Sequence, residues 1–212
     1  MIRKFSMTAV AAAALCGTVS AANATVFGGS ATFTDLTTGN PLTVTALPNP
    51  KTFATGSISA GGSDYFSGFM ALLTTDTQGG LPCFFGCTAT DQVSLSFSWS
   101  SPSSAPGTTQ NGSVSQTDFA IASYDNGNLQ WANDTHVDSN GTYAEQLVTF
   151  TDGAQAYVDV YDAAIRGTTT SESTQFDVRI RDVRDPIPEP MTLSLLGAGF
   201  LGLGLAKRHR KA

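Results

Sequence analysis

Basic residues are scarce in this sequence, with 11 Lys and Arg against 17 Asp and Glu in 212 residues. Six of the 11 lie in residues 1–24 and 191–212. The five others, set against all 17 acidic residues, give residues 25–190 a net charge of −12. Such a surface repels phosphate backbones, which argues against nucleic acid as a partner. It favours solubility and leaves divalent cations open as a partner.

Cysteine and histidine are also rare, with three and two residues. Cys16 falls in an apolar N-terminal segment, which leaves Cys83 and Cys87, separated by three residues. An even number of cysteines in an oxidising compartment predicts a Cys83–Cys87 disulfide. A redox pair usually has two intervening residues, and a zinc site would need ligands beyond His136. We therefore expect no resident metal or cofactor, apart from the calcium loops considered below.

Long helices are not expected, because Ser, Thr and Gly dominate from Thr25 onward and Lys and Glu are few. The clearest strand is predicted over residues 92–100, where Val93, Leu95, Phe97 and Trp99 alternate with small polar residues. Residues 63–75 fit a helix and a strand equally well. Further strands are predicted over residues 26–34, 52–60, 117–124, 143–151, 154–161 and 175–183.

Turn signals separate these runs, among them Asn111-Gly112, residues 125–128, Asn140-Gly141 and Asp152-Gly153. Seven or more short strands with frequent turns predict an all-β fold, an antiparallel, jelly-roll-like β-sandwich over residues 25–185. We expect a signal helix before this domain and a transmembrane helix after it.

A catalytic constellation is not recognisable. His136 lies near Asp138 and Ser139, but nearness in sequence is not triad geometry, and G-x-S-x-G is absent. An exposed loop histidine is the preferred interpretation, and we expect no enzyme. A carboxylate pair for glycoside hydrolysis stays open, because the sequence does not show distances in space.

Two oxygen-rich stretches, residues 125–128 and 134–141, are candidate Ca²⁺ loops, with ordinary turns as the alternative. Aromatic side chains could stack on sugars. Trp99 is expected to face inward, whereas Trp131, beside a polar loop, is the candidate sugar contact.

The N-terminus has the layout of a secretory signal peptide. Arg3 and Lys4 precede an apolar, Ala-rich run over residues 7–19, and Ala22-Asn23-Ala24 provides the small residues of a cleavage site. We expect residues 1–24 to be removed after Ala24; an uncleaved anchor is the alternative.

The C-terminal segment has three parts: a Pro-rich linker over residues 186–190, an uncharged run over residues 191–206, and a basic cluster. As a helix the run would measure about 24 Å, short of the roughly 30 Å hydrocarbon core, but snorkelling basic side chains lengthen the span. Residues 191–212 are therefore predicted to be a transmembrane helix with a cytoplasmic end; a buried core helix is the alternative. The stop-transfer cluster comprises Lys207, Arg208, Arg210 and Lys211.

Together, Pro188-Glu189-Pro190, the apolar run and the basic cluster resemble the PEP-CTERM sorting signal of Gram-negative bacteria that make extracellular polysaccharide. The resemblance covers about the last 25 residues. It implies that an exosortase, a membrane-embedded transpeptidase, recognises the tripeptide and removes the tail. The domain would first be held in the periplasm on the inner membrane, and then reach the cell surface or extracellular matrix.

Three functions follow as hypotheses. The first is a non-enzymatic exported surface or matrix protein associated with exopolysaccharide or biofilm. The second is a carbohydrate-binding module for exopolysaccharide, Ca²⁺-assisted and using Trp131. The third is a secreted glycoside hydrolase, which requires a cleft with two close carboxylates.

Overall fold

The chain is all-β in the part that the structure describes. This computed structural model describes residues 24–37, 42–76, 87–118, 125–168 and 171–184, and within them it has twelve strands and no helix. Every strand pairing is antiparallel. The predicted all-β, antiparallel class is confirmed.

The strands vary from 3 to 15 residues in length. Their bounds are β1 Gly28–Asp35, β2 Leu42–Leu47, β3 Lys51–Ala54, β4 Ser63–Asp76, β5 Cys87–Ser101, β6 Ala105–Asp118, β7 Asp125–Trp131, β8 His136–Asp138, β9 Gly141–Thr149, β10 Gln155–Tyr161, β11 Ala163–Thr168 and β12 Ser171–Asp182.

Hydrogen bonds join all twelve strands into one sheet, in the order β3-β1-β5-β6-β7-β11-β12-β10-β9-β8. Strand β4 pairs with β12 and carries β2 on its other edge. A sandwich of two separate sheets is not confirmed, because strand pairing connects all twelve strands without a break.

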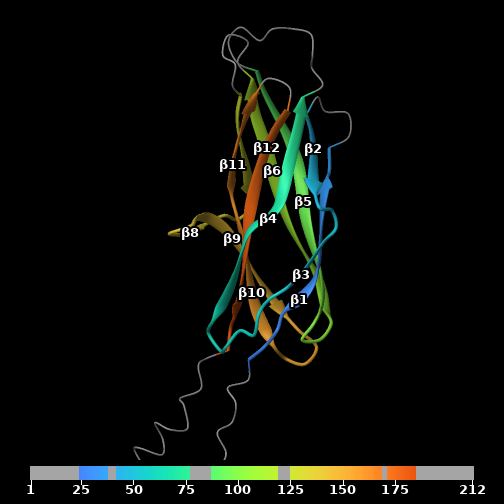
Figure 1. Cartoon of the computed structure of the whole chain (residues 1–212), viewed down its shortest axis with the longest axis vertical. Helices are drawn as coiled ribbons and strands as arrows, with labels where there is room; N and C mark the ends of the chain where they lie inside the picture. The colour runs from blue at the N-terminus through green and yellow to red at the C-terminus, as the bar shows by residue number, and fades with distance from the viewer. Residues whose placement is uncertain (1–23, 38–41, 77–86, 119–124, 169–170, 185–212) are drawn as a thin grey trace, which may run out of the picture.

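The sheet folds back on itself around one hydrophobic core, with its strands along the long axis of the molecule and β4 and β12 across from β5 and β6 (Figure 1). Aromatic rings join the two halves. Phe69 on β4 lies 6.2 Å from Phe97 on β5, and Trp131 on β7 lies 5.5 Å from Phe176 on β12, between ring centroids. Burial of these large side chains is the main favourable contribution to folding.

Strand β5 follows the pattern predicted for residues 92–100. Val93, Leu95, Phe97 and Trp99 are at most 5% exposed, as a period of two requires for one face on the core. The ambiguous residues 63–75 form strand β4, with Gly68 at φ +58°.

Two predicted turns are wrong. Asn111-Gly112 lies inside β6, and residues 125–128 lie inside β7. Their backbone groups pair with neighbouring strands on both sides, and this tertiary pairing overrides the local preference for a turn. The turns at Asn140-Gly141 and Asp152-Gly153 are confirmed, with positive φ at both glycines.

Several predictions fall outside the described residues. They are the signal peptide with Ala22 and the run before it, Cys83 and hence the disulfide to Cys87, residues 119–124 of one predicted strand, and the whole segment 185–212. In the portion of the chain that the structure describes, no helix is long and apolar enough to span a bilayer.

The two ends of the described chain leave the molecule at the same pole (Figure 1). Strand β1 begins there and β12 ends there. The described chain therefore enters and leaves the sheet at one end of its long axis.

Candidate functional site

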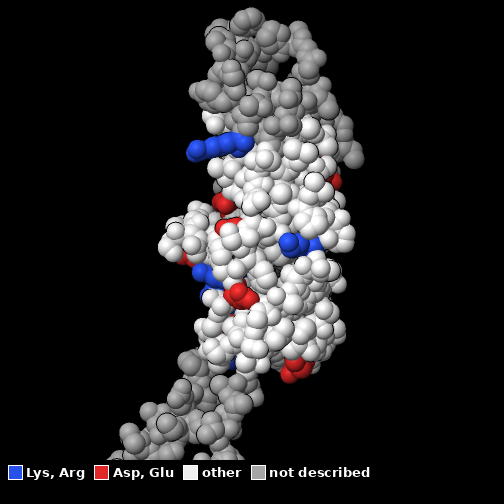
Figure 2. Space-filling model, in the orientation of Figure 1, with Lys and Arg blue, Asp and Glu red and all other residues white. Residues whose placement is uncertain are grey.

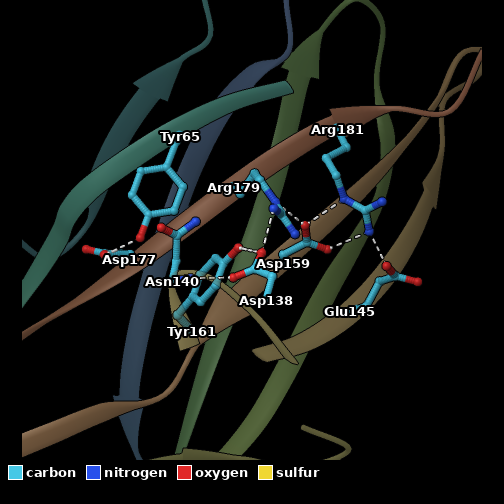
Figure 3. Close-up of polar contacts among 9 residues, drawn as sticks. All are labelled: Tyr65, Asp138, Asn140, Glu145, Asp159, Tyr161, Asp177, Arg179 and Arg181. Atoms are coloured by element: carbon cyan, nitrogen blue, oxygen red, sulfur yellow. Dashed lines mark hydrogen bonds and ion pairs between the residues drawn. The ribbon is translucent and has the colours of Figure 1, made fainter. Parts of the chain in front are cut away.

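The densest polar cluster lies on the outer face of β12 (Figure 3). Phe176, Val178 and Ile180 are at most 1% exposed, so the alternating Asp177, Arg179 and Arg181 face outward, as their sequence pattern predicts. Side chains from β4, β8, β9 and β10 meet this row.

Asp159 on β10 is the centre of the cluster and is 0% exposed. Its Oδ2 accepts hydrogen bonds from Nε of Arg179 and Nε of Arg181, each at 2.7 Å, and its Oδ1 accepts one from Arg181 Nη2 at 3.0 Å. Arg181 also pairs with Glu145 on β9 and lies 4.9 Å above the Tyr157 ring. Both guanidinium groups have a raised pKa: hydrogen bonds and charge from Asp159 raise it, although burial acts in the opposite direction.

Asp138 connects the short strand β8 to this cluster. Its Oδ2 accepts hydrogen bonds from Arg179 Nη1 at 2.7 Å and the Tyr161 hydroxyl at 2.8 Å, and its Oδ1 accepts one from the Asn140 amide at 2.7 Å. Burial raises the pKa of the Asp138 carboxyl, but these donors outweigh burial and hold it below its usual value. Burial and the bond to Asp138 raise the pKa of Tyr161.

Tyr65 and Asp177 extend the cluster across β4 and β12. The Tyr65 hydroxyl donates to Asp177 Oδ2, and the amide of Gly68 donates to Asp177 Oδ1 at 2.7 Å. Burial and the bond to Asp177 raise the pKa of Tyr65 to about 12. The Tyr65 ring also contacts Tyr161, at 5.6 Å between centroids.

Three carboxylates of this cluster, Asp138, Glu145 and Asp159, each pair with an arginine, whereas Asp177 accepts hydrogen bonds from Tyr65 and Gly68. A glycosidase needs one carboxyl with a raised pKa to act as a general acid, and the pKa of Asp138 moves the other way. The arrangement therefore fits a structural role, in which ion pairs connect β8, β9 and β10 to β12. The sequence showed the outward arginines, but it did not show that Asp159 would be buried beneath them.

The residues considered for a hydrolase triad do not assemble one. The Asp138 carboxylate is directed to Arg179 and Tyr161. The exposed His136 ring stacks on Tyr143, at 5.4 Å between centroids. Ser139 is exposed in the turn after β8.

The structure does not support Trp131 as a sugar contact. Its side chain is 1% exposed, and its indole N–H donates to the Tyr161 carbonyl at 2.9 Å. The position follows from register: Trp131 is the last residue of β7, on the inward side with Leu129. Trp99 faces the core, as expected.

Residues 125–128 and 134–141 do not form the predicted calcium-binding loops. Residues 125–128 belong to β7, and residues 134–141 include β8, where Asp138 has arginine and tyrosine partners. Among the described residues, no group of three or more His, Cys, Asp and Glu side chains is placed to hold a metal ion.

A hollow of about 300 Å³ lies where β5, β6 and β7 meet the turn after β7. Residues that line it with polar side chains are Gln92, Asn111, Ser113, Gln130, Asn133 and Asp134. The turn is fixed by the Ala132 amide, which donates to the Asn111 carbonyl at 2.8 Å, and by Asn133 in the left-handed conformation, with φ +64°.

One carboxyl in the wall of the hollow, that of Asp134, has a second carboxyl as a neighbour outside the lining. Asp134 accepts a hydrogen bond from Gln130 Nε2 at 2.9 Å and interacts with Asp162 behind it. Burial, together with the Asp134 interaction, raises the pKa of Asp162 to about 6, although the Trp131 amide donates to Asp162 at 2.9 Å and lowers it.

A second carboxyl pair lies at the β1–β5 edge of the core. Asp91 on β5 is 0% exposed and lies beside Asp35, the last residue of β1. Burial raises the pKa of Asp91, and the charge of Asp35 raises it further. Hydrogen bonds from the Thr37 hydroxyl and the Gln92 backbone amide lower this pKa. Asp35 is held by the amides of Thr37 and Val44, at 3.0 and 3.3 Å.

Comparison with known proteins identifies the C-terminal segment. No curated protein and no solved structure matches the chain. The family model of the PEP-CTERM protein-sorting motif matches residues 186–211, which contain Pro188, Glu189 and Pro190 and the basic cluster. Residues 186–211 are therefore a PEP-CTERM protein-sorting signal, a tail that exosortase, a membrane enzyme, recognises in exported proteins.

Proposed function

We propose that this protein is a non-enzymatic component of the cell surface or extracellular matrix, associated with exopolysaccharide. An exosortase releases it from the inner membrane at Pro188-Glu189-Pro190. The observation that carries the proposal is the sorting signal at residues 186–211. The signal-peptide pattern of residues 1–24 supports the same route, because it provides entry into the export pathway.

The shape of the sheet suits display from one attachment point. Both ends of the described chain leave at one pole of an elongated molecule, so a tail beginning at residue 185 holds the sheet by that pole (Figure 1). The rest of the surface then faces away from the membrane. On the face drawn in Figure 2, uncharged residues cover most of the described surface, which fits an uncharged, hydrated environment.

A non-enzymatic role is supported by the main polar cluster. Asp138, Glu145 and Asp159 each pair with an arginine, so their charges serve mutual attraction between strands. A general acid would require a carboxyl that keeps its proton near neutral pH. Carboxylates in such pairs are poor candidates for that task, and Asp162, whose pKa burial raises to about 6, lies outside this cluster.

The test is the mass and location of the protein recovered from its native envelope. We expect the wild-type chain to lack residues 191–212, and a Glu189→Ala variant to keep them and remain with the inner membrane. Glu145→Ala, in the folded domain, is the matched control and should be processed as the wild type. A wild-type chain that retains its tail, or Glu189→Ala processing at the wild-type rate, would contradict the proposal.

A further inference from the structure

The outer face of β5, β6 and β7 carries only uncharged polar side chains over three successive rows. Each row crosses three paired strands, with one residue from each strand. The rows are Gln92–Ser113–Gln130, Thr90–Ser115–Asn128 and Thr88–Thr117–Asn126. We call these nine residues the amide–hydroxyl face.

The pattern follows from strand alternation. On β6, the inward Gln110, Gly112, Val114 and Gln116 are buried, which turns the residues between them outward. Neighbouring strands are spaced about 4.8 Å apart, so the hydroxyl and amide groups form a regular array of donors and acceptors. Some of them already bond across strands, as Thr88 and Thr117 do at 2.9 Å.

The hollow opens at one end of this face. Gln92, Ser113 and Gln130 belong both to the first row and to its lining, and Asn111 lies one outward position further along β6. Its volume of about 300 Å³ is at the lower end of the range for small-molecule sites. It therefore has room for a small part of a larger ligand that continues along the face.

The chemistry of this surface selects the class of ligand. Carboxamides and hydroxyls both donate and accept hydrogen bonds, which suits a ligand covered with hydroxyl groups. The described lining has no basic side chain, and its one acidic residue, Asp134, would repel an anionic polymer. Protein partners usually need buried aromatic or aliphatic anchors, which the nine residues do not provide.

We propose that the amide–hydroxyl face, with its hollow at Gln92, Asn111, Ser113 and Gln130, binds a neutral polysaccharide. This inference rests on the proposed association with exopolysaccharide and names its site. Binding would use many weak hydrogen bonds along the face, and the hollow would hold one sugar unit and fix the position of the chain. The buried Trp131 supports the floor and does not stack on the ligand.

The experiment is native affinity electrophoresis of the mature protein in gels that contain dextran, galactomannan or xylan, with alginate as the anionic comparison. We expect at least one neutral polysaccharide to retard the protein and alginate to have no effect. Gln130→Ala combined with Asn111→Ala should weaken retardation about tenfold, which is the value of one or two hydrogen bonds. Gln155→Ala is the matched control: it removes a side-chain amide from β10, outside the amide–hydroxyl face, and should bind as the wild type.

Thermal unfolding of each variant shows whether the fold is kept. If Gln130→Ala lowers the midpoint, Gln92→Ala on the far wall of the hollow provides the test with the same expected loss. The proposal is overturned if no neutral polysaccharide retards the protein, if alginate retards it equally, or if the folded hollow variants bind as the wild type. Electrophoresis does not depend on tail removal, so its failure leaves the sorting proposal intact, and failed sorting leaves the binding result intact.

Discussion

Asp159 and Arg179 lie directly opposite each other on β10 and β12, and Arg179 Nε donates to Asp159 Oδ2 at 2.7 Å. The carboxylate is fully buried, and the guanidinium lies 5.1 Å from the Tyr143 ring. One cross-strand pair therefore joins two central strands and, through Arg179, also holds Asp138 of β8.

Replacing Asp159 with Asn should destabilise the protein strongly. The variant leaves Arg179 and Arg181 without their shared counter-charge in a buried position, and breaking such a pair costs about 3–5 kcal/mol. We expect the thermal midpoint to fall by about 10 °C. Glu145→Gln is the control, since Glu145 makes one part-exposed contact and should cost about 1 kcal/mol or less. Equal losses in both variants would show that burial of Asp159 contributes nothing.

Asp138→Asn should cost more stability at neutral pH than in acid. The folded-state pKa of Asp138 is depressed, so its contribution is present above the unfolded value of about 4 and is lost as the pH falls through the folded value. The expected loss at pH 7 is about 1 kcal/mol, small because solvent screens this part-exposed carboxylate. Urea unfolding at pH 7 and pH 3 measures this loss of stability. A loss that is larger at pH 3 than at pH 7 would contradict the prediction.

Asp91→Asn should have the opposite pH dependence. The folded-state pKa of Asp91 is raised, so the folded protein binds its proton more tightly than the unfolded chain does, and stability falls as the pH rises from about 4 through the raised value. The variant removes the buried charge and should be more stable than the wild type at pH 7, by about 1–3 kcal/mol.

The measurement for Asp91 is the urea midpoint of variant and wild type between pH 4 and pH 7. The difference between the two proteins should grow across this range. Because carboxylates remote from this site titrate identically in both proteins, the difference reports Asp91 together with its neighbour Asp35. A constant difference would mean that Asp91 titrates normally.

Strands could be predicted from the sequence wherever apolar and polar residues alternate clearly. In β5 and β12 large apolar residues occupy every second position, and burial on one face then fixes the strand. In β6 and β7 both faces contain small polar or glycine residues, so turn chemistry at Asn111-Gly112 and Gly127 misled the prediction. What decided these segments was pairing with strands distant in sequence.

The location of the polar sites could not be predicted for a related reason. Arg179 and Arg181 were correctly expected to face outward, but Asp159 reaches them only through the β10–β12 register. Trp131 was expected at the surface because polar residues follow it. Its burial depends on β7 pairing between β6 and β11, a long-range arrangement that the local sequence does not encode.

Gly112→Ala tests how closely Trp131 is packed beneath the hollow. A Cβ at Gly112 would lie 2.7 Å from Trp131 Cε3 and 2.8 Å from the Gln130 carbonyl oxygen, and the latter is backbone held in the β6–β7 ladder. Neither atom can retreat without disturbing the sheet, so we expect a loss of about 1–3 kcal/mol. Gly107→Ala on the same strand is the control, because its nearest atom, the Phe97 carbonyl oxygen, would be 3.4 Å away. Thermal unfolding with tryptophan fluorescence measures both variants; a Gly112→Ala midpoint equal to that of Gly107→Ala would mean that the indole does not pack against this glycine.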